Sequence, residues 1–382
     1  MKITFISDQF FPRTSADSEQ IVSSLSALGT IADVSLISAC YRHKEPATKE
    51  ELEAYYQEKI NFSLEFLSHL FKNIRGIEKL SFALRSAFKV KKMNVDVVYT
   101  RNIPILISVL LFTKKPIFFE SYRPWPSRNV FAKAFFKKLE DHSRFGGVIL
   151  HSKFAGKSFA DVGFTSEQLI VAHNAVNLDK YESFDRFETL KSFDLPEDKV
   201  IVTYSGRVTV KKGLMRIFDL ADEFSDIIFL IVGSEGEGAI EEKAKQYSNI
   251  KVLPWQDKKS VYRLLVASDI LYIPNSLHAR EKAQNTVLPL KTFLYKASGI
   301  PIIAPNIEDV AEVLTHMKTA VLVEPDNLKK EKEVFSLLIE DQKLRQEIGL
   351  NAQNEMKNLT WLNRANDILS FINKRLEALG FH

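Results

Sequence analysis

Two basic residues that follow a glycine suggest a site for phosphate groups. Arg207 comes after Gly206 at the end of the apolar run Val200–Ser205, and Lys212 lies five residues further on, where a helical pattern starts. The amino end of a helix favours anions, and nearby cations strengthen this preference, arginine as a bidentate donor and lysine as a point charge. We therefore predict a diphosphate site at Arg207 and Lys212. The alternative is a solvated basic loop.

Further turns in the second half of the chain could border this site. Gly233 follows the apolar run Ile227–Val232, and Trp255 follows Ile250–Leu253. In open α/β sheets, ligands bind at the carboxyl ends of the strands, and glycine lets the backbone approach them closely. The candidate ligand-binding residues are Gly206, Gly233, Pro254, Trp255, Asn285, Pro289 and Lys291.

Short apolar runs that alternate with helical patterns must position these residues. Continuous apolar runs are typical of strands buried on both faces of a parallel sheet. The expected strands of the first half are Ile3–Ser7, Val34–Ser38, Val95–Thr100, Pro116–Glu120, Gly147–His151 and Leu169–Ala172. Those of the second half are Val200–Ser205, Ile227–Val232, Ile250–Leu253, Ile270–Ile273, Ile300–Ala304 and Ala320–Val323. The pattern predicts two doubly wound α/β units, each with a parallel sheet.

The length of 382 residues suits two domains better than one core. Residues 177–197 are polar and charged and contain Pro196, so we place the boundary there. We expect a first domain over residues 1–178 and a second over residues 179–360. The closing segment, residues 361–382, has a helical pattern over Trp361–Leu379.

Composition and motifs exclude several classes of protein. Cys40 is the single cysteine, so no disulfide can form within the chain. The amino-terminal apolar stretch is short and alternates with polar residues, and no run reaches the ~18 apolar residues of a membrane-spanning helix, so we expect a cytoplasmic protein without a signal peptide. There is no Asp-x-Asp motif, no His/Cys cluster, and no G-x-G-x-x-G after the first strand of either half. We therefore expect no metal, no cofactor and no plain NAD enzyme.

Charge is distributed unevenly along the chain. Residues 1–178 hold 24 of the 52 basic and 17 of the 48 acidic residues, a net charge of +7 that leaves −3 for the remainder. Residues 62–92 combine apolar residues at helical spacing with seven basic and two acidic ones, and residues 123–138 add a second basic, aromatic stretch. Such helices either lie on the inner face of an anionic membrane, or their apolar sides pack on the core of the domain. No nucleic-acid module is recognisable, so nucleic acid is not an expected partner.

Taken in order, the segments of the second half resemble the donor domain of GT-B glycosyltransferases, in the retaining family four of group 1 type. The resemblance rests on the Gly206-Arg207 turn with a lysine-glycine pair five residues on, and on the turn Ile231–Gly233. It also rests on Pro289–Gly299, which is similar to the family segment P-x-K-x-x-E-Y-x-x-x-G. It covers about residues 200–361 and, weakly, the rest of the chain.

The resemblance implies two Rossmann-like domains that face a cleft, with the C-terminal helix returning to the first domain. It implies retaining, metal-independent transfer of a sugar, as in hexosyltransferases, from a nucleoside-diphosphate donor to the hydroxyl of a glycan or lipid-linked saccharide, in the synthesis of cell-surface polysaccharides or glycoconjugates. Arg207 and Lys212, with Lys291, would stabilise charge on the leaving diphosphate. We expect His151 and His173 to be structural. The acceptor-side residues that the resemblance implies are Arg13, Ser15, Asp17, Glu120 and Tyr122.

The chain departs from the family pattern in both halves. The glutamate that usually holds the donor ribose is replaced by Leu294. A second family glutamate, separated from the first by seven residues, is replaced by Thr286, and Glu281 is out of register for either. A hydrogen bond to a charged group contributes about 1.5–3 kcal/mol, so the ribose contact is lost or made differently. Tyr122 stands where a histidine usually lies near the reacting sugar, and tyrosine is a poor base near pH 7. Two alternatives stay open, a non-catalytic nucleotide- or sugar-binding homologue and a nucleotide-sugar epimerase.

Overall fold

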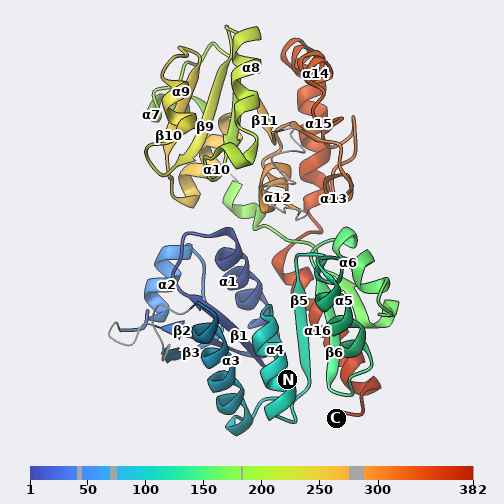
Figure 1. Cartoon of the computed structure of the whole chain (residues 1–382). Helices are drawn as coiled ribbons and strands as arrows, with labels where there is room; N and C mark the ends of the chain where they lie inside the picture. Colours follow the sequence, from blue (N-terminus) through green and yellow to red (C-terminus); the bar gives the residue numbers. More distant parts are fainter. Residues whose placement is uncertain (41–44, 69–74, 182–183, 275–287, 382) are drawn as a thin grey trace. The chain divides into compact units, whose positions relative to one another are not determined.

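The computed structural model describes residues 1–40, 45–68, 75–181, 184–274 and 288–381. These residues form two compact units, Met1–Asn174 together with Trp361–His382, and Ala175–Thr360 (Figure 1). Each unit contains one sheet whose strands all run parallel. The expected class, two doubly wound α/β units, is confirmed.

The sheet of the first unit has the order β3-β2-β1-β4-β5-β6-β7. Its interior strands are almost wholly buried, which explains why they are continuous apolar runs in the sequence. The strands are β1 (Lys2–Phe10), β2 (Asp33–Cys40), β3 (Ser63–Ser68), β4 (Val97–Thr100), β5 (Ile117–Ser121), β6 (Phe145–Leu150) and β7 (Leu169–Val171).

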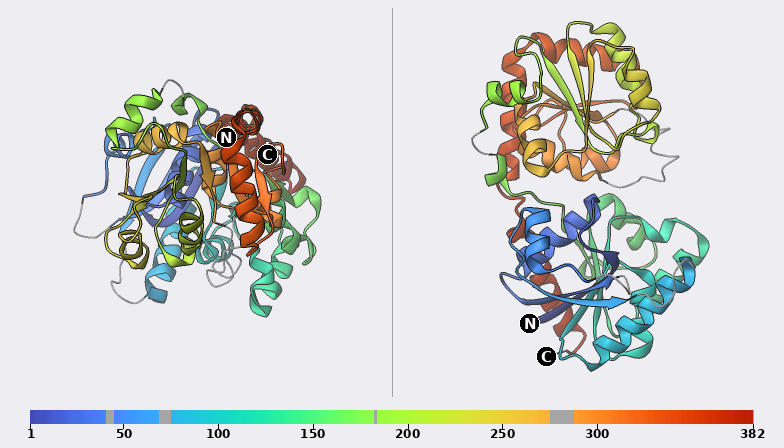
Figure 2. Two further views of the ribbon diagram at one scale, coloured as in Figure 1. Left: turned by 90° about the horizontal axis from the view of Figure 1, so that it is seen from above. Right: turned by 90° about the vertical axis from the view of Figure 1, so that its left-hand side faces the viewer.

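Helices cover both faces of this first sheet, and an apolar cluster lies under each layer (Figure 2). One layer consists of α1 (Ala16–Leu28), α2 (Lys49–Tyr56) and α16 (Trp361–Ala378). The other consists of α3 (Arg75–Lys92), α4 (Ile103–Phe112), α5 (Val130–Glu140) and α6 (Lys153–Ala160). No described helix of the chain is long and apolar enough to span a bilayer.

The sheet of the second unit has the order β10-β9-β8-β11-β12-β13. Its strands are β8 (Ile201–Ser205), β9 (Ile228–Ser234), β10 (Ile250–Pro254), β11 (Ile270–Tyr272), β12 (Ile302–Pro305) and β13 (Val321–Val323). One face packs against α8 (Met215–Glu223), α9 (Ala239–Ala244), α14 (Leu328–Glu340) and α15 (Gln342–Met356). The other packs against α7 (Arg186–Ser192), α10 (Lys258–Ala267), α12 (Leu290–Ala297) and α13 (Glu308–Ala311).

One element was missed by the sequence analysis. Residues 62–92 were expected to be a helical stretch, but Ser63–Ser68 is the edge strand β3, which pairs with β2, and α3 begins only at Arg75. The predicted positions Leu70, Lys72 and Ile74 lie outside the described residues. β3 is half-buried over most of its length, so its sequence lacks the continuous apolar run that marks the interior strands.

The C-terminal helix α16 returns to the first unit, as expected, and packs against α1 and β6. The α16 side chains Ile368 and Ile372 are buried. The ring of Phe371, on the same helix, meets the ring of Phe118 edge to face at a centroid distance of 5.8 Å. A helix distant in sequence therefore completes the core of the first unit.

We predict that Ile372→Ala destabilises the first unit by about 2–5 kcal/mol, because it leaves a cavity between α16 and the sheet. Leu362→Ala, at an exposed position of the same helix, is the matched control and should change stability by less than about 0.5 kcal/mol. Urea unfolding followed by circular dichroism measures both. Equal stability of the two variants would contradict the packing of α16.

Candidate active site

Two glycine turns meet at the carboxyl end of the second sheet. Gly206 follows β8 and Gly233 lies in β9, with φ angles of 131° and 111°. The Gly206 N–H donates to the carbonyl of Val232 at 2.9 Å, and a Cβ on Gly233 would lie 2.6 Å from the carbonyl oxygen of Gly206. Only glycine fits so close an approach at these angles. The edge where ligands of such sheets bind therefore presents backbone at these two turns.

Three cations from separate segments gather beside the first turn. Arg207 follows Gly206, Lys212 ends the 3-10 turn η4 (Val210–Lys212) just before α8, and both are exposed. Lys291 lies in the first turn of α12, and a Cβ on Gly206 would be 3.1 Å from its Nζ. Burial, and then the charge of Lys212, hold the pKa of Lys291 well below its usual range. An anion bound here would relieve this repulsion, so the edge is suited to a phosphate group.

Two tyrosines fix the spacing of these cations. The Nζ of Lys291 lies 3.6 Å from the centroid of the Tyr204 ring, and the Tyr204 hydroxyl donates to the carbonyl of Arg207 at 3.0 Å. The hydroxyl of Tyr295, on α12, accepts from the Ser205 N–H at 2.7 Å, and burial raises its pKa to about 12. Tyr295 thereby ties α12 to the end of β8, and Tyr204 lies under both Lys291 and the turn at Arg207.

A cavity of about 470 Å³ lies between the loops that follow β8 and β9. Its lining consists of residues 208–210 and 235–241, and it includes the acidic residues Glu235, Glu237 and Glu241. The Nε of Arg207 is 3.5 Å from Glu235 Oε1, but both side chains are largely exposed, so this pair contributes little stability. Arg207 can exchange this contact for a phosphate, and the cavity is of a size that suits a small molecule.

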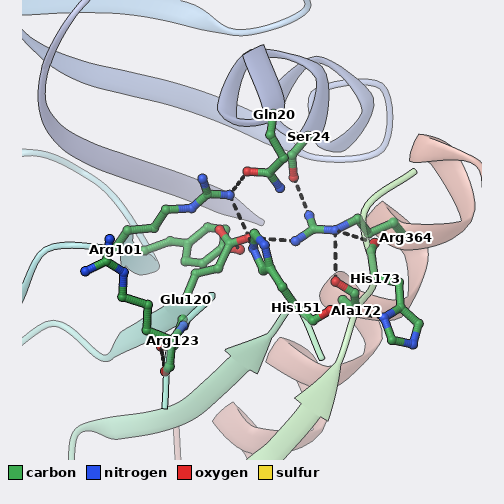
Figure 3. Close-up of polar contacts among 11 residues, drawn as sticks. Gln20, Ser24, Arg101, Glu120, Arg123, His151, Ala172, His173 and Arg364 are labelled. Carbon is green, nitrogen blue, oxygen red and sulfur yellow. Dashed lines mark hydrogen bonds and ion pairs between the residues drawn. The ribbon is translucent and has the colours of Figure 1, made fainter. Parts of the chain in front are cut away.

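In the first unit, the carboxyl group of Glu120, on β5, contacts residues that lie on β4, directly after β4, directly after β6 and on α16 (Figure 3). Its Oε1 accepts from Arg101 Nη2 at 2.8 Å, from Arg364 Nη2 at 2.6 Å and from His151 Nε2 at 2.6 Å. Its Oε2 accepts from the Tyr99 hydroxyl at 2.6 Å. Burial alone would raise the pKa of Glu120, but the two arginines hold it well below its usual range.

The same arginines determine the state of His151. Burial lowers the pKa of His151 to about 4, and the charges of Arg101 and Arg364 add to this despite the contact with Glu120. The imidazole is therefore neutral near pH 7, and its Nε2–H is the donor to the carboxylate. Arg364, on α16, also donates to the Ser24 hydroxyl at 2.5 Å and to the carbonyls of Ala172 and His173.

Residues 185–355, within the second unit, match the family described as glycosyl transferases group 1. This segment of the second unit belongs to the group 1 glycosyltransferases. This confirms the resemblance to the retaining GT-B enzymes of family four that the sequence carries.

Relatives and solved structures fit this family. A 41.2 kDa protein from the cps region of Klebsiella pneumoniae, itself uncharacterized, is 24% identical over 274 residues, which are 70% of this chain and 67% of that protein. An Escherichia coli K12 protein, provisionally named the colanic acid biosynthesis glycosyl transferase WcaI, is 27% identical over 185 residues, 43% of each chain. The crystal structure of Anabaena HepE with UDP-glucose, at 14% identity, has the same fold with a TM-score of 0.73 over 98% of this chain and 100% of that one.

In this glycosyltransferase an apolar residue, Leu294, occupies the position of the usual ribose glutamate, and its neighbours are apolar too. Leu294 packs against the apolar cluster formed by α10, α12 and their strands. Thr286 and Asn285 lie outside the described residues. Pro289 precedes α12 as its amino-terminal cap residue, and Pro254 and Trp255 are exposed at the end of β10, where the Trp255 N–H donates to the Ser234 carbonyl at 2.9 Å.

Three of the predicted acceptor-side residues lie in the loop after β1 and in the first turn of α1. Ser15 precedes α1, and its hydroxyl donates to Ser18 at 3.0 Å. Asp17, in the first turn of α1, accepts from Gln9 Nε2 at 2.5 Å, and Arg13 is exposed. This loop and Glu120 both lie at the carboxyl ends of strands of the first sheet.

Glu120 itself lies in the interior, because its side chain is only 1% exposed and has four partners. Tyr122, two residues further on, is half-buried, with its ring 6.2 Å from the ring of His151 and 5.2 Å from the guanidinium of Arg123. The buried Glu120 thus holds together the elements that carry the other acceptor-side candidates. His151 is buried and structural, as expected.

The contacts that Tyr204, Tyr295, Arg101 and Arg364 make are not evident from the sequence. Tyr295 lies within the segment Pro289–Gly299 that carries the family resemblance, so its position was a signal, but its bond to Ser205 could not be inferred. Arg364 is one of many charged residues in a C-terminal helical pattern. Only the packing of that helix reveals that it meets a buried carboxylate.

We predict that lowering the pH from 7 to 5 reduces the free energy of unfolding, because His151 is buried in its neutral form. The unfolded pKa is about 6.5 and the folded pKa is about 4, so the unfolded chain binds the extra proton between these values. Between pH 7 and pH 5 the free energy of unfolding should therefore fall by about 2 kcal/mol on account of His151. Urea unfolding at the two pH values measures this loss.

The control is His151→Asn, which has no titrating group at this position. Its stability should be lower than that of the wild type at pH 7, but its fall between pH 7 and pH 5 should be smaller by about 2 kcal/mol. Glu120 does not interfere, because a carboxyl group with a lowered pKa loses its contribution only below about pH 4. An identical pH dependence in both proteins would contradict a neutral, buried His151.

Proposed function

We propose that this glycosyltransferase moves a sugar from a nucleoside-diphosphate donor to a hydroxyl acceptor, a glycan or lipid-linked saccharide. The reaction would serve the synthesis of a cell-surface polysaccharide or glycoconjugate. In this proposal residues 179–360 bind the donor, and residues 1–178 with the C-terminal helix bind the acceptor. Arg13, Ser15, Asp17 and Tyr122 are the candidates on the acceptor side.

The observation that carries the proposal is the gathering of Arg207, Lys212 and Lys291 around the turn at Gly206. Burial lowers the pKa of Lys291, and the positive charge of Lys212 lowers it further, so an anion bound at this turn would favour the charged form of Lys291. A diphosphate supplies that charge, and it would gain more from these side chains as its own negative charge grows in the transition state. The adjoining cavity of about 470 Å³ leaves room for the rest of a nucleotide.

The proposed chemistry breaks the bond between the anomeric carbon and the diphosphate oxygen. The electron pair stays on that oxygen, where Arg207, Lys212 and Lys291 stabilise it. The acceptor hydroxyl forms the new bond to the anomeric carbon, and its proton passes to the departing phosphate oxygen. The protein groups act by position and charge, so the step needs no protein base near the reacting sugar.

Relatives support the biological setting and a first donor to test. One relative carries a name in colanic acid biosynthesis and another comes from a cps region. The Anabaena structure of the same fold holds UDP-glucose. UDP-sugars are therefore the first donors to test, and cell-surface saccharides the first acceptors.

We predict that Arg207→Ala combined with Lys212→Ala lowers turnover by at least about 100-fold, because two donors to the developing charge are lost. UDP release from UDP-sugars, in the presence of a saccharide acceptor panel, measures turnover, and titration calorimetry with UDP measures binding. Lys211→Ala is the matched control, since Lys211 is exposed in the same 3-10 turn. Unchanged turnover in the double variant would refute the assignment.

The same assays distinguish the two alternatives. A non-catalytic homologue, which the apolar setting of Leu294 favours, would bind UDP and release none from any UDP-sugar. An epimerase would consume the donor without an acceptor. A transferase releases UDP only in step with the formation of a glycosylated acceptor.

We predict that a pair of substitutions at Tyr204 separates its two contacts. Tyr204→Phe removes the bond to the Arg207 carbonyl but keeps the ring under Lys291, and should weaken UDP binding by about threefold to tenfold. Tyr204→Leu also removes the ring, which stabilises the charged lysine, so the pKa of Lys291 should fall further.

The distinguishing readout is the pH dependence of UDP affinity by calorimetry. The loss of affinity at alkaline pH should move to lower pH in Tyr204→Leu, and stay at the wild-type pH in Tyr204→Phe. Thermal unfolding of each variant checks that the second unit stays folded. The same pH profile in both variants would show that the ring does not position or stabilise Lys291.

A further inference from the structure

The helix α3 has an apolar stripe on each of two opposite sides. One stripe faces the sheet and is buried, with Phe82, Ala83 and Val90 in the core of the first unit. The other points outward, and its members Ile77, Leu80 and Phe88 are each about half exposed. A surface helix needs only one apolar side to pack on a sheet. The outward stripe is therefore not explained by the fold of the first unit.

The neighbouring helix α4 continues this outward apolar surface. Leu111 is 70% exposed, and Ile107 and Phe112 are also exposed. The rings of Phe88 and Phe112 approach each other at a centroid distance of 5.3 Å, and the two helices lie side by side in the first unit (Figure 1). We refer to Ile77, Leu80, Phe88, Ile107, Leu111 and Phe112 as the α3–α4 surface. Contiguous exposed apolar side chains of this kind mark interaction sites.

Lysines border the α3–α4 surface. Lys91 and Lys92 end α3, Lys114 follows α4, and all three are exposed. The segments 75–93 and 103–115 contain eight basic residues and one acidic residue, Glu78. The surface is thus complementary to a negatively charged partner.

The composition of the border favours lipid over protein as that partner. Protein interfaces are depleted in lysine, because the ammonium group is strongly hydrated and loses that water when it is buried. At a bilayer the ammonium groups stay hydrated among the headgroups while apolar side chains insert beneath them. Lysines at such a position gain from the negative potential of anionic lipids.

We propose that the α3–α4 surface docks on an anionic lipid bilayer. The exposed apolar side chains insert at the level of the headgroups, and Lys91, Lys92 and Lys114 lie against lipid phosphates. Docking of this kind holds the first unit at the membrane without a spanning helix. It does not depend on the proposed transfer reaction, because it involves neither the donor site nor a nucleotide.

The test is flotation of the full chain with vesicles in the absence of nucleotide. Vesicles of phosphatidylglycerol and phosphatidylcholine in equal parts provide the anionic surface, and pure phosphatidylcholine provides the neutral one. The wild type should float with the anionic vesicles at low salt, at least tenfold more than with neutral ones, and less in 0.5 M salt, because salt screens the lysine contribution. A wild type that ignores anionic vesicles at low salt overturns the proposal.

Two variants locate the surface. Lys91→Glu combined with Lys92→Glu should weaken anionic-vesicle binding at least tenfold, and Phe88→Ser combined with Leu111→Ser should weaken it at low and at high salt. The matched controls lie in the second unit. They are Lys343→Glu with Lys357→Glu for charge, and Leu350→Ser for an exposed apolar side chain. Circular dichroism checks the fold of each protein.

Two other results would overturn the proposal. If the surface variants bind vesicles as well as the wild type does, the lipid contact lies elsewhere. If the wild type self-associates in analytical ultracentrifugation, ignores vesicles, and loses self-association in Phe88→Ser with Leu111→Ser, a second copy of the chain is the occupant. A protein that floats as predicted but shows no transferase activity would refute the proposed function alone.

Discussion

The carboxylate of Glu120 and the two arginines around it hold the first unit together at its carboxyl edge. A buried carboxylate is costly unless it is paired and its lone pairs are satisfied, and here Arg101, Arg364, His151 and Tyr99 satisfy it. These partners come from β4, the residue after it, the end of β6 and the C-terminal helix. Removing Glu120 would leave the two buried arginines without their shared carboxylate, so the cluster fixes how these elements meet.

At the second sheet, basic side chains lie near one another, in contrast to the paired charges around Glu120. Arg207, Lys212 and Lys291 lie together, and the only carboxylate that pairs with Arg207 among the described residues, Glu235, is exposed and 3.5 Å away. Tyr204 and Tyr295 hold this arrangement through a cation–π contact and hydrogen bonds that involve no charged partner. Donors and cations fixed in advance at the place where negative charge develops are the form of catalysis that the proposal requires.

The departures from the family pattern affect the proposed ribose contact and leave the proposed phosphate-binding residues in place. Leu294 stands at the position of the usual ribose carboxylate and packs against an apolar cluster, while Arg207, Lys212 and Lys291, the residues proposed to bind phosphate, are present. The acidic residues Glu235, Glu237 and Glu241 line the nearby cavity, where Glu241 accepts from the Ser234 hydroxyl at 2.6 Å. On the first unit, the lysine-bordered surface of α3 and α4 is made by helices on one face of the sheet, so a lipid contact there leaves the carboxyl edge to the acceptor.

The sequence by itself determined the class of fold, most strands, and the glycine turn whose basic residues are proposed to bind phosphate. Interior parallel strands are continuous apolar runs, and the glycine and basic residues of the Gly206 turn are adjacent in the chain, so local pattern carries both. Sequence missed β3, because an edge strand is only half-buried and lacks that pattern. Only the tertiary structure decided that Glu120 is internal, that Arg364 reaches it from 244 residues away, and that one side of α3 stays uncovered. Burial and ion pairing depend on which distant segments meet, and a local pattern does not contain that information.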